Sequence, residues 1–457
     1  MSQIKIEEKP KVYSASSNPQ HVVILGGGFA GIGVLKKLQK KFQNDNNVEI
    51  TLVSKDNFLL FTPMLPEIVS GMIETRHIVT PVRSFCKNAN YFEADVKAID
   101  LENKKVSLSH TIGRQNIQQS GEQHEHNLKY DYLVIAMGSE NNFFGNKEIE
   151  ENSFTMKTIN DAITLRNHII RVLEQAHLEQ ENKDLRKSLL TFVIVGGGFS
   201  GVETVGSVND FVRDTVRQYY PNIYMTEVRI VLVSATDKIL EQIDEELGKF
   251  ALEKLEESGV EFIMNSKVKG ASKEKAILDG DTTIPCHTII WTAGITQNEL
   301  IANLQCEHAK GHRITTNNYL EVKDYESQVY ALGDCASVTD PHTGKPYPPT
   351  AQHAIRQSDV AADNITMEIF AKRRGKEKLE ESKKRKFDYK TKGMMAQIGK
   401  RTGVAILFGR IKLHGFLAWW LWRTYYLANL PTIKKKLKVI EDWTSDIIFK
   451  PDVSQVQ

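Results

Sequence analysis

The stretch that decides the fold is VVILGGGFAGIG, residues 22–33, because a very similar stretch, FVIVGGGFSGVE, returns at residues 192–203. Each copy contains a run of β-branched and aliphatic residues, a Gly-x-Gly-x-x-Gly pattern and a segment with helical spacing. This order is typical of a strand, a tight turn and a helix. The chain therefore contains the same strand-turn-helix motif twice.

Each glycine of the pattern has its own physical task. The first allows the turn, the second lets a pyrophosphate approach the backbone, and the third lets the helix pack closely on the strand. The phosphates then lie at the positive end of the helix. A single copy could be a plain strand-helix turn, but two copies, each directly after an apolar strand, favour two dinucleotide sites. The glycines are Gly26, Gly28 and Gly31 in the first copy, and Gly196, Gly198 and Gly201 in the second.

Composition places the chain among ordinary globular proteins. Its 457 residues are enough for two to three domains, with 41% hydrophobic and 25% charged residues. A net charge of +2 gives no sign of a nucleic-acid partner. The four cysteines, Cys86, Cys286, Cys306 and Cys335, form no Cys-x-x-Cys pair or zinc spacing, so we expect reduced, structural thiols and no metal site. Residues 1–20 lack an apolar stretch and are predicted to be a flexible, unprocessed leader.

Strand and helix signals alternate from Val22 onward, which predicts an α/β fold with parallel sheets and crossover helices. Residues 109–131 interrupt this order and are predicted to form a hairpin excursion. The highly charged residues 371–387 are predicted to be helical or mobile and to form a solvated surface.

Three further strands run into glycine-containing turns: YDYLVIAMGS at residues 130–139, HTIIWTAGI at 287–295 and VYALGDCAS at 329–337. A glycine there permits a cofactor to lie against the backbone, and an aspartate can accept hydrogen bonds from ribityl hydroxyls. These turns supply the candidate cofactor-binding residues Gly138, Gly294, Gly333 and Asp334.

With these motifs in order, the chain resembles the flavoproteins with two Rossmann-like dinucleotide-binding domains. In that superfamily the first fingerprint holds FAD, and the second, inserted within the FAD domain, holds NAD(P)H. The chain is most similar to the type II NADH dehydrogenases, the single-subunit, non-pumping NADH:quinone oxidoreductases. The motifs that carry this resemblance are LFTPMLPEIVSG (60–71), MKTINDAI (156–163), GGGFSGVE (196–203), LGDCA (332–336), PPTAQHAIRQ (348–357) and GFLAWWLWRTYYL (415–427).

The resemblance implies a domain division and a reaction. Residues 21–160 and 297–395 would form the FAD domain, residues 161–296 the NAD(P)H domain, and residues 396–457 a region for membrane association and dimerisation. NADH would reduce FAD by hydride transfer, and the two electrons would then reduce a membrane quinone without proton pumping. Thr62, in the first of these motifs, would also contact FAD.

The resemblance also assigns two candidate catalytic residues. AQHAIRQ is similar to the quinone-site motif of the family, so Ala351, Gln352 and Gln357 would border the quinone pocket, with Gln352 contacting a quinone carbonyl. Arg356 departs from the family pattern, and an amphipathic helix with a buried glutamine is the alternative. Glu203 matches the family glutamate beside the flavin, where desolvation would raise the pKa of its carboxyl and suit a proton relay. Its alternative is a glutamate on a helix surface.

The acids that normally end the second strand of each dinucleotide unit are replaced by Ser54 and Ser234. A serine can still hydrogen-bond a ribose. Loss of the carboxylate also removes the repulsion that excludes a 2′-phosphate. No arginine follows Ser234, although Lys238 lies nearby. We therefore expect NADH as the hydride donor, with weakened discrimination against NADPH.

The C-terminal segment combines an apolar run, residues 416–422, with aromatic rings and many basic residues. The run is far shorter than the about 20 residues that cross a bilayer, so we expect an amphipathic helical segment lying on a lipid surface. Pro431 should divide it into two helices. A helix packed in a dimer interface or core is the alternative, and the resemblance implies both roles. We therefore expect a homodimeric peripheral protein on the cytoplasmic face of the plasma membrane or, in a eukaryote, on the inner mitochondrial membrane.

Two other activities remain as alternatives. A sulfide:quinone oxidoreductase shares the fold and the anchor but needs a pair of cysteines near the flavin, and none follows Cys335. A redox-switched binding protein resembling apoptosis-inducing factor would bind NADH without fast quinone turnover, and the AQHAIRQ motif and the aromatic C-terminal segment count against it.

Overall fold

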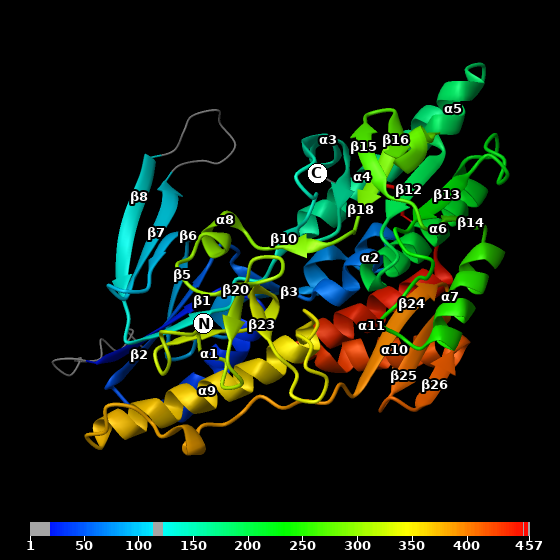
Figure 1. The fold of residues 1–457 in the computed structure, drawn as a ribbon. Helices are drawn as coiled ribbons and strands as arrows, with labels where there is room; N and C mark the ends of the chain where they lie inside the picture. Colours follow the sequence, from blue (N-terminus) through cyan, green and yellow to red (C-terminus); the bar gives the residue numbers. More distant parts are fainter. Residues whose placement is uncertain (1–18, 113–121, 451, 456–457) are drawn as a thin grey trace, which may run out of the picture. The chain divides into compact units, whose positions relative to one another are not determined.

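The computed structural model describes residues 19–112, 122–450 and 452–455 (Figure 1). The described chain forms two compact units. The first contains the residues up to Leu59, Pro81–Ser139 and Gln297–Tyr389. The second contains Leu60–Thr80, Glu140–Thr296 and the residues from Lys390 onward. The predicted leader, residues 1–20, lies outside the described residues except for its last two positions.

A five-stranded parallel sheet with the order β22-β9-β1-β2-β5 forms the centre of the first unit. Its middle strands are buried along most of their length, as expected for parallel strands covered on both faces. β2 lies on one side of β1 and β9 on the other, which makes the end of β1 a topological switch point. The strands are β1 (Gln20–Leu25), β2 (Val48–Ser54), β5 (Asn90–Glu93), β9 (Tyr132–Ile135) and β22 (Val329–Ala331).

Helices α1 (Phe29–Lys41) and α9 (Ala351–Arg373) lie side by side in the first unit (Figure 1). Gly33 permits this approach, because a Cβ there would lie 2.1 Å from the Ser358 Oγ. The unit also contains the short helix α8 (Glu299–Ala302) and a small sheet of β20 (His308–Ala309), β21 (Arg313–Thr316) and β23 (Ala336–Val338). Strands β3 (Phe58–Leu60) and β4 (Val79–Pro81) lie where the chain passes from one unit to the other.

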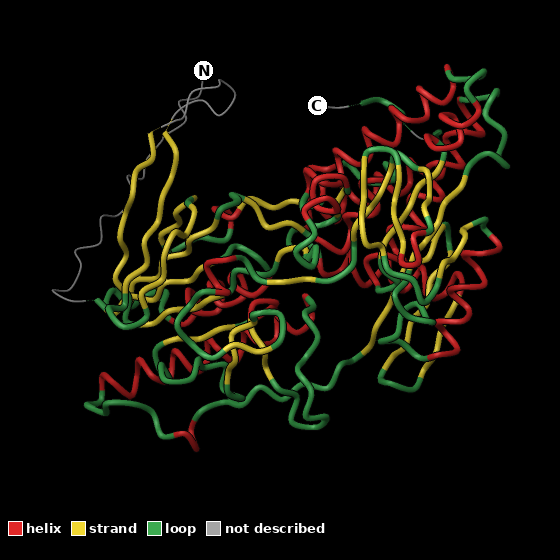
Figure 2. The backbone as a smooth tube through the Cα atoms, turned by 45° about the horizontal axis from the view of Figure 1, so that its top comes forward, coloured by secondary structure: helices red, strands yellow, loops and turns green. Residues whose placement is uncertain are grey.

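The predicted hairpin at residues 109–131 is confirmed. Strand β7 (Lys105–Ile112) pairs antiparallel with β8 (Glu122–Lys129), and β6 (Asp95–Asp100) pairs with the other edge of β7. These long strands extend away from the parallel sheet of the same unit, as Figure 2 shows. The tip, residues 113–121, lies outside the described part of the chain.

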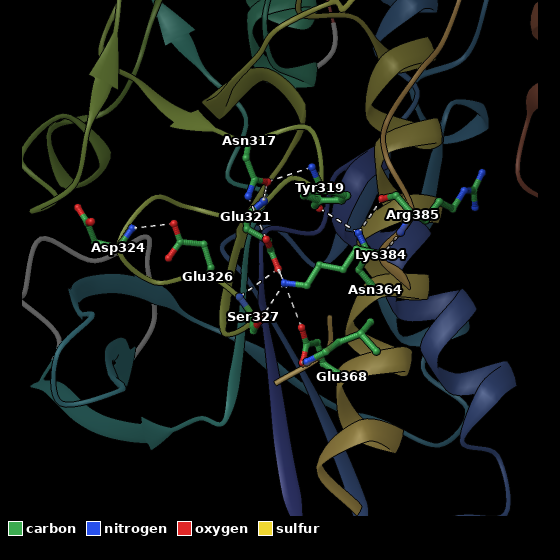
Figure 3. Close-up of polar contacts among 11 residues, drawn as sticks. Asn317, Tyr319, Glu321, Asp324, Glu326, Ser327, Asn364, Glu368, Lys384 and Arg385 are labelled. Carbon is green, nitrogen blue, oxygen red and sulfur yellow. Dashed lines mark hydrogen bonds and ion pairs between the residues drawn. The ribbon is translucent and has the colours of Figure 1, made fainter. Parts of the chain in front are cut away.

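Lys384, in the charged stretch 371–387, is buried in the first unit (Figure 3). Its Nζ lies 2.5 Å from Glu321 Oε1 and 3.1 Å from Glu368 Oε1, and it donates to Ser327 Oγ at 2.8 Å. The three charged side chains are 5%, 2% and 3% exposed for Lys384, Glu321 and Glu368. The expectation of a solvated surface is therefore wrong at Lys384, because two buried carboxylates compensate its charge.

The second unit is built around a parallel sheet with the order β11-β18-β12-β13-β14. All five residues of its middle strand, β12, are buried. β13 and β18 flank β12 in the same way that β2 and β9 flank β1, so the second unit repeats the switch point of the first. The strands are β11 (Phe154–Thr155), β12 (Thr191–Val195), β13 (Arg229–Val233), β14 (Val260–Ile263) and β18 (Thr288–Trp291).

Helices and small sheets complete this unit. The longest helix of the second unit is α6 (Phe199–Tyr219), which follows β12 directly. Helix α4 (Ile159–Leu178) begins at a capping box formed by Thr158 and Asp161. The other helices here are α2 (Leu65–Val69), α3 (Lys147–Asn152), α5 (Lys183–Leu189) and α7 (Glu245–Glu257). The small antiparallel sheets are formed by β10 (Glu140–Asn141) with β19 (Ile295–Thr296), and by β15 (Val268–Ser272), β16 (Lys275–Leu278) and β17 (Thr283–Pro285).

The C-terminal part of the second unit is a meander followed by two helices, coloured orange to red in Figure 1. The meander consists of β24 (Gly393–Gly399), β25 (Thr402–Leu407) and β26 (Ile411–His414), and the helices are α10 (Gly415–Asn429) and α11 (Ile433–Ile448). The predicted break at Pro431 is confirmed, because it lies between the two helices. Of the helices within the described ranges, none has both the length and the apolarity that crossing a bilayer requires.

We expect Lys384→Met to lower the free energy of unfolding by about 3–5 kcal/mol, because it leaves two buried carboxylates without their cation. Lys383→Met is the matched control, since the neighbouring Lys383 side chain is 53% exposed and pairs only with Glu380 at the surface. Its effect should stay within about 0.5 kcal/mol. Urea unfolding followed by circular dichroism measures both variants, and equal midpoints would contradict a stabilising role for the buried Lys384 pairs.

Candidate functional site

The first glycine turn joins β1 to α1 and depends on the absence of side chains. Gly26 has a φ of +109°, and a Cβ there would lie 2.2 Å from the carbonyl oxygen of Ala136. A Cβ on Gly31 would lie 1.9 Å from the carbonyl oxygen of Gly26. A Cβ on Gly28, in contrast, would meet no atom within 4 Å. The packing of the protein thus explains Gly26 and Gly31, whereas Gly28 leaves open space beside the backbone.

The second turn, between β12 and α6, repeats this arrangement. Gly196 has a φ of +119°, and its Cβ would lie 2.8 Å from Thr292 Oγ1. A Cβ on Gly201 would lie 1.8 Å from the Gly196 oxygen, while one on Gly198 would again meet nothing within 4 Å. The two units therefore present the same open turn.

Both turns leave the start of a helix without a side-chain cap. Gly28 is the N-cap of α1 and Gly198 is the N-cap of α6, and neither helix start donates a hydrogen bond to a capping side chain. The first N–H groups of a helix have no partner inside the helix, and the helix dipole favours negative charge there. Open space beside these donors fits the pyrophosphate of a dinucleotide in each unit.

The two serines at the strand ends support these turns. Ser54 ends β2 and Ser234 follows β13, and both are buried. A Cβ on Gly27 would lie 2.6 Å from Ser54 Oγ, and one on Gly197 would lie 2.8 Å from Ser234 Oγ. Each hydroxyl thus packs against the middle of its glycine turn, close to the predicted ribose position.

Among the residues that the structure describes, no carboxylate is hydrogen-bonded to Ser234. Its Oγ accepts a hydrogen bond from the backbone N–H of Thr236 at 3.3 Å. Lys238, two residues further, pairs at 3.4 Å with Glu245, and its side chain is 52% exposed. An exposed lysine held by a surface glutamate can still turn toward a nearby phosphate, because such pairs contribute little free energy.

The turn after β22 brings several predicted cofactor residues together in the first unit. Gly333 has a φ of +76°, and its N–H donates to Gln357 Oε1 at 2.7 Å. The next residue, Asp334, accepts from Ser139 Oγ at 3.2 Å through Oδ2. Gly138, with a φ of +73°, would meet nothing within 4 Å if it carried a Cβ. The ends of β9 and β22 therefore leave space beside the backbone of Gly138, and the neighbouring Ser139 donates a hydrogen bond to the carboxylate of Asp334.

The predicted quinone residues lie at the start of α9. Thr350 caps this helix by accepting a hydrogen bond from the N–H of His353. Ala351 and Gln352 are partly exposed in its first turn, whereas Gln357 is 3% exposed and holds the turn at Gly333. Gln357 is thus buried and hydrogen-bonded to the turn at Gly333, whereas Ala351 and Gln352 are accessible to solvent.

Two other predicted residues belong to the second unit. Gly294 has a φ of +85° after β18, and its Cβ would lie 3.0 Å from Phe144 Cζ. Thr62, predicted to contact FAD, is exposed at the start of the short segment that precedes α2. Thr62 thus belongs to the second unit, whereas the first glycine turn belongs to the first unit.

Glu203 lies in the first turns of α6, and its Oε1 accepts two hydrogen bonds. The backbone N–H of Gln397 on β24 donates at 3.3 Å, and Trp422 Nε1 on α10 donates at 3.0 Å. Burial raises the pKa of Glu203 to about 8, and the two donors act in the opposite direction. The carboxyl therefore keeps its proton at pH 7 and releases it at mildly alkaline pH. A glutamate on a helix surface would not behave in this way.

A second buried carboxyl, Glu67 on α2, was missed by the sequence analysis. It is 1% exposed, and it accepts from Arg423 at 3.4 Å and from Trp443 Nε1 at 3.1 Å. Burial raises the pKa of this carboxyl, while the Arg423 guanidinium lowers it. The only local signal was a glutamate inside an otherwise apolar short helix, and its partners lie more than 350 positions away in the chain.

The thiols do not provide a nucleophile. All four cysteines are free, and burial raises the pKa of Cys286, Cys306 and Cys335 to about 11. Cys335, next to Asp334, donates to the carbonyl oxygens of Ile135 and Leu332. These three thiols remain protonated near neutral pH, so they supply no thiolate for disulfide or polysulfide chemistry.

Comparisons with known proteins agree with this arrangement. Residues 20–358 match the family model for pyridine nucleotide-disulphide oxidoreductases, and residues 391–452 match the model for the NDH2 C-terminal domain. A probable NADH dehydrogenase of Dictyostelium discoideum is 35% identical, over 95% of this chain and 91% of the relative. The mitochondrial external NADH-ubiquinone oxidoreductase 2 of Saccharomyces cerevisiae is 31% identical, over 95% of this chain and 82% of the relative.

Solved structures show the same fold at lower identity. NDH2 from Plasmodium falciparum, in complex with NADH, aligns with a TM-score of 0.84 and 20% identity, over 96% of this chain and 100% of that one. The sulfide:quinone oxidoreductase from Aquifex aeolicus aligns with a TM-score of 0.67 and 17% identity, over 94% and 96% of the two chains.

We expect Gly31→Ala and Gly28→Ala to have different effects. Gly31→Ala should destabilise the fold by about 1–3 kcal/mol or more, because its Cβ collides with the Gly26 carbonyl. Gly28→Ala should leave the fold intact but lower the amount of nucleotide that copurifies. Circular dichroism and nucleotide absorbance after denaturation measure the two effects. Full nucleotide content in Gly28→Ala would contradict the placement of the pyrophosphate at this turn.

Proposed function

This chain belongs to the type II NADH dehydrogenases of the pyridine nucleotide-disulphide oxidoreductase family, and from that premise we propose how its residues serve the reaction. The protein is an FAD-dependent oxidoreductase that uses NADH and passes two electrons to a quinone. The predicted family, fold class, cofactors and activity are confirmed at this level.

The observation that carries the residue assignment is the repetition of an open, uncapped helix start at two switch points. A hydride donor and a flavin each need their own pyrophosphate cradle, and the chain supplies one in each unit. We assign FAD to the turn at Gly28 and NADH to the turn at Gly198, following the order in the family. Bound FAD would supply the redox chemistry that links hydride transfer from NADH to two-electron reduction of quinone.

The side chains of the protein would position FAD and quinone and would donate a proton. Asp334, held by Ser139, would accept hydrogen bonds from the FAD ribityl chain, and Gly138 leaves room for the cofactor. Gln352 would donate its amide N–H to a quinone carbonyl, and Ala351 would line the pocket beside it. Glu203, protonated at pH 7, would give a proton through its carboxyl oxygen to the reduced quinone. Contacts of Gln357 with quinone and of Thr62 with FAD stay predictions.

Ser234 bears on the choice of hydride donor. Because its hydroxyl replaces the usual acid, no negative charge at that residue repels a 2′-phosphate. Lys238 lies two residues beyond Thr236 and can offer a cation. We therefore propose NADH as the main donor, with NADPH accepted more weakly.

The rival activities receive less support. A sulfide:quinone oxidoreductase needs two reactive thiols, and burial keeps the thiols of Cys286, Cys306 and Cys335 protonated. The redox-switched binding protein would not need accessible residues in the family quinone motif, where Ala351 and Gln352 are partly exposed.

The helices α10 and α11 would hold the protein on a lipid surface. They carry exposed apolar side chains beside a cluster of lysines, a combination typical of helices lying in a membrane interface. The exposed apolar residues are Phe416, Leu417, Trp420, Ile433, Leu437, Ile440, Ile447 and Ile448. We propose a peripheral position on the membrane that contains the quinone. The side of the membrane and the homodimer stay predictions.

The half-reactions test this function. Anaerobic mixing with NADH should bleach the flavin absorbance, NADPH should bleach it more slowly, and a short-chain quinone should restore it. Gln352→Leu should slow the return of absorbance about tenfold, as expected for one lost hydrogen bond to the substrate, and leave bleaching by NADH unchanged. Gln305→Leu is the matched control, since Gln305 is an exposed glutamine of the same unit.

Equal losses in both half-reactions of Gln352→Leu would contradict its place in the quinone site. A flavin that bleaches with NADH but ignores quinone in the unchanged protein would favour the redox-switched binding protein. Bleaching by sulfide but not by NADH would favour the sulfide:quinone oxidoreductase.

Membrane attachment has its own prediction. Leu417→Ser and Leu437→Ser should each weaken partition onto vesicles of phosphatidylcholine and phosphatidylglycerol by about tenfold to 100-fold, because each removes roughly 1.5–3 kcal/mol of apolar burial. Leu178→Ser is the control, since Leu178 is exposed on α4. Point substitutions suit this test, because deletion of the helices would also remove the buried Trp422 and Trp443. Equal partition of all three variants would contradict the proposed face.

A further inference from the structure

Trp422 is the contact between α10 and the carboxyl of Glu203. Its side chain is 1% exposed, and its Nε1 donates to Glu203 Oε1 at 3.0 Å. Neighbouring positions of the same helix are open to solvent: Leu417 is 62% exposed and Trp420 is 55% exposed. One helix thus presents an indole N–H to a buried carboxyl and apolar groups to the outside.

The hydrogen bond is held in a rigid aromatic setting. The Trp422 ring lies edge-on to Tyr426, with ring centres 4.6 Å apart, and the centres of the Tyr426 and Phe61 rings are 6.0 Å apart. Residues one turn apart on a helix face the same way, so Trp422 and Tyr426 pack as a pair. The indole has little freedom to turn its N–H away from Glu203.

The charges around Glu203 come from several elements of the second unit. On α2, Glu67 raises the proton affinity of Glu203, and Arg423 of α10 partly offsets that charge. The charge of Asp446 on α11 raises the pKa of Glu67, as the charge of Glu67 raises the pKa of Glu203. On β24 the group that faces Glu203 is the neutral N–H of Gln397, and on α10 it is Trp422 together with Tyr426.

We propose that Trp422 is a positioning residue for Glu203, so that the helix predicted to lie on the membrane also adjusts proton delivery to the reduced quinone. This inference rests on the proposed role of Glu203 as the proton donor. A hydrogen bond from a neutral N–H stabilises the carboxylate more than the carboxylic acid. Trp422 therefore eases release of the proton, and its position depends on how α10 is seated.

The test is the pH dependence of quinone reduction in the intact, FAD-loaded enzyme. With NADH saturating, the rate should fall as pH rises through the pKa of Glu203, near 8, because the proton donor is then lost. Trp422→Phe keeps an aromatic ring but removes the N–H. We expect it to move this fall upward by about one pH unit, since a hydrogen bond to a charged group is roughly equivalent to one pKa unit or more. Flavin bleaching by NADH should keep its rate.

Trp291→Phe is the matched control. Trp291 is also a buried tryptophan of the second unit, but its Nε1 donates to the backbone oxygen of Asn142 at 3.0 Å. It should leave the midpoint of the pH profile in place. Should the phenylalanine leave a cavity that unfolds α10, benzothienylalanine at position 422 replaces the N–H by sulfur and keeps the shape of the indole. It should give the same upward shift.

Glu203→Gln separates this inference from the function on which it rests. It should slow quinone reduction and abolish the alkaline fall. If Glu203→Gln does so while Trp422→Phe and the benzothienyl analogue leave the midpoint unchanged, the Trp422 inference is overturned and the role of Glu203 stands. If Glu203→Gln leaves the rate and the profile unchanged, both are overturned. An upward shift in the Trp422 variants that disappears in the Glu203→Gln background supports the coupling.

Discussion

The arrangement of both units centres on a helix that begins at a glycine turn and has no side-chain cap. Most α-helices in the described residues, α4 and α7 among them, begin with a side chain that accepts a hydrogen bond from the first turn. Helices α1 and α6 begin after the glycines Gly28 and Gly198 and have no side-chain cap. Each lies at the carboxyl end of the central strand of a parallel sheet, where the chain diverges to either side. An anion is the group that best completes such an end, which supports the proposal of one nucleotide site at each turn.

The C-terminal segment has both buried aromatic and exposed apolar side chains. Trp422 and Trp443 are buried in the second unit, where they donate to Glu203 and Glu67. Side chains elsewhere on the same two helices are exposed and apolar. The segment is therefore part of the core of its unit, as the alternative of a core helix expected, and its exposed apolar side chains support the proposed attachment to lipid. Arg423 connects the two helices, since its guanidinium lies 4.4 Å from the ring centre of Trp419 on α10 and 4.5 Å from that of Trp443 on α11.

Buried charge is where sequence reasoning was weakest. Lys384 lies in a stretch so rich in lysine and glutamate that solvent exposure was the natural expectation, yet Glu321 and Glu368 enclose it. Glu67 and Asp210 offered no local pattern either, and burial raises the pKa of Asp210 to about 7. Burial of a charged group is decided by partners distant in the chain, and no window of neighbouring residues contains that information. Glu203 was singled out only because its motif resembled a family in which that glutamate has a role.

The sequence by itself determined the repeated strand-turn-helix device, the alternation that gives parallel sheets, the hairpin at β7 and β8, and the break at Pro431. These features follow from local rules: glycine at a turn with positive φ, apolar runs in buried strands, and proline between helices. Only the tertiary structure decided that Leu60–Thr80 packs in one unit with the C-terminal helices, that Gln357 holds Gly333, and that Trp422 meets Glu203. The physical reason is that such contacts join segments far apart in the chain, so no local sequence pattern contains their geometry.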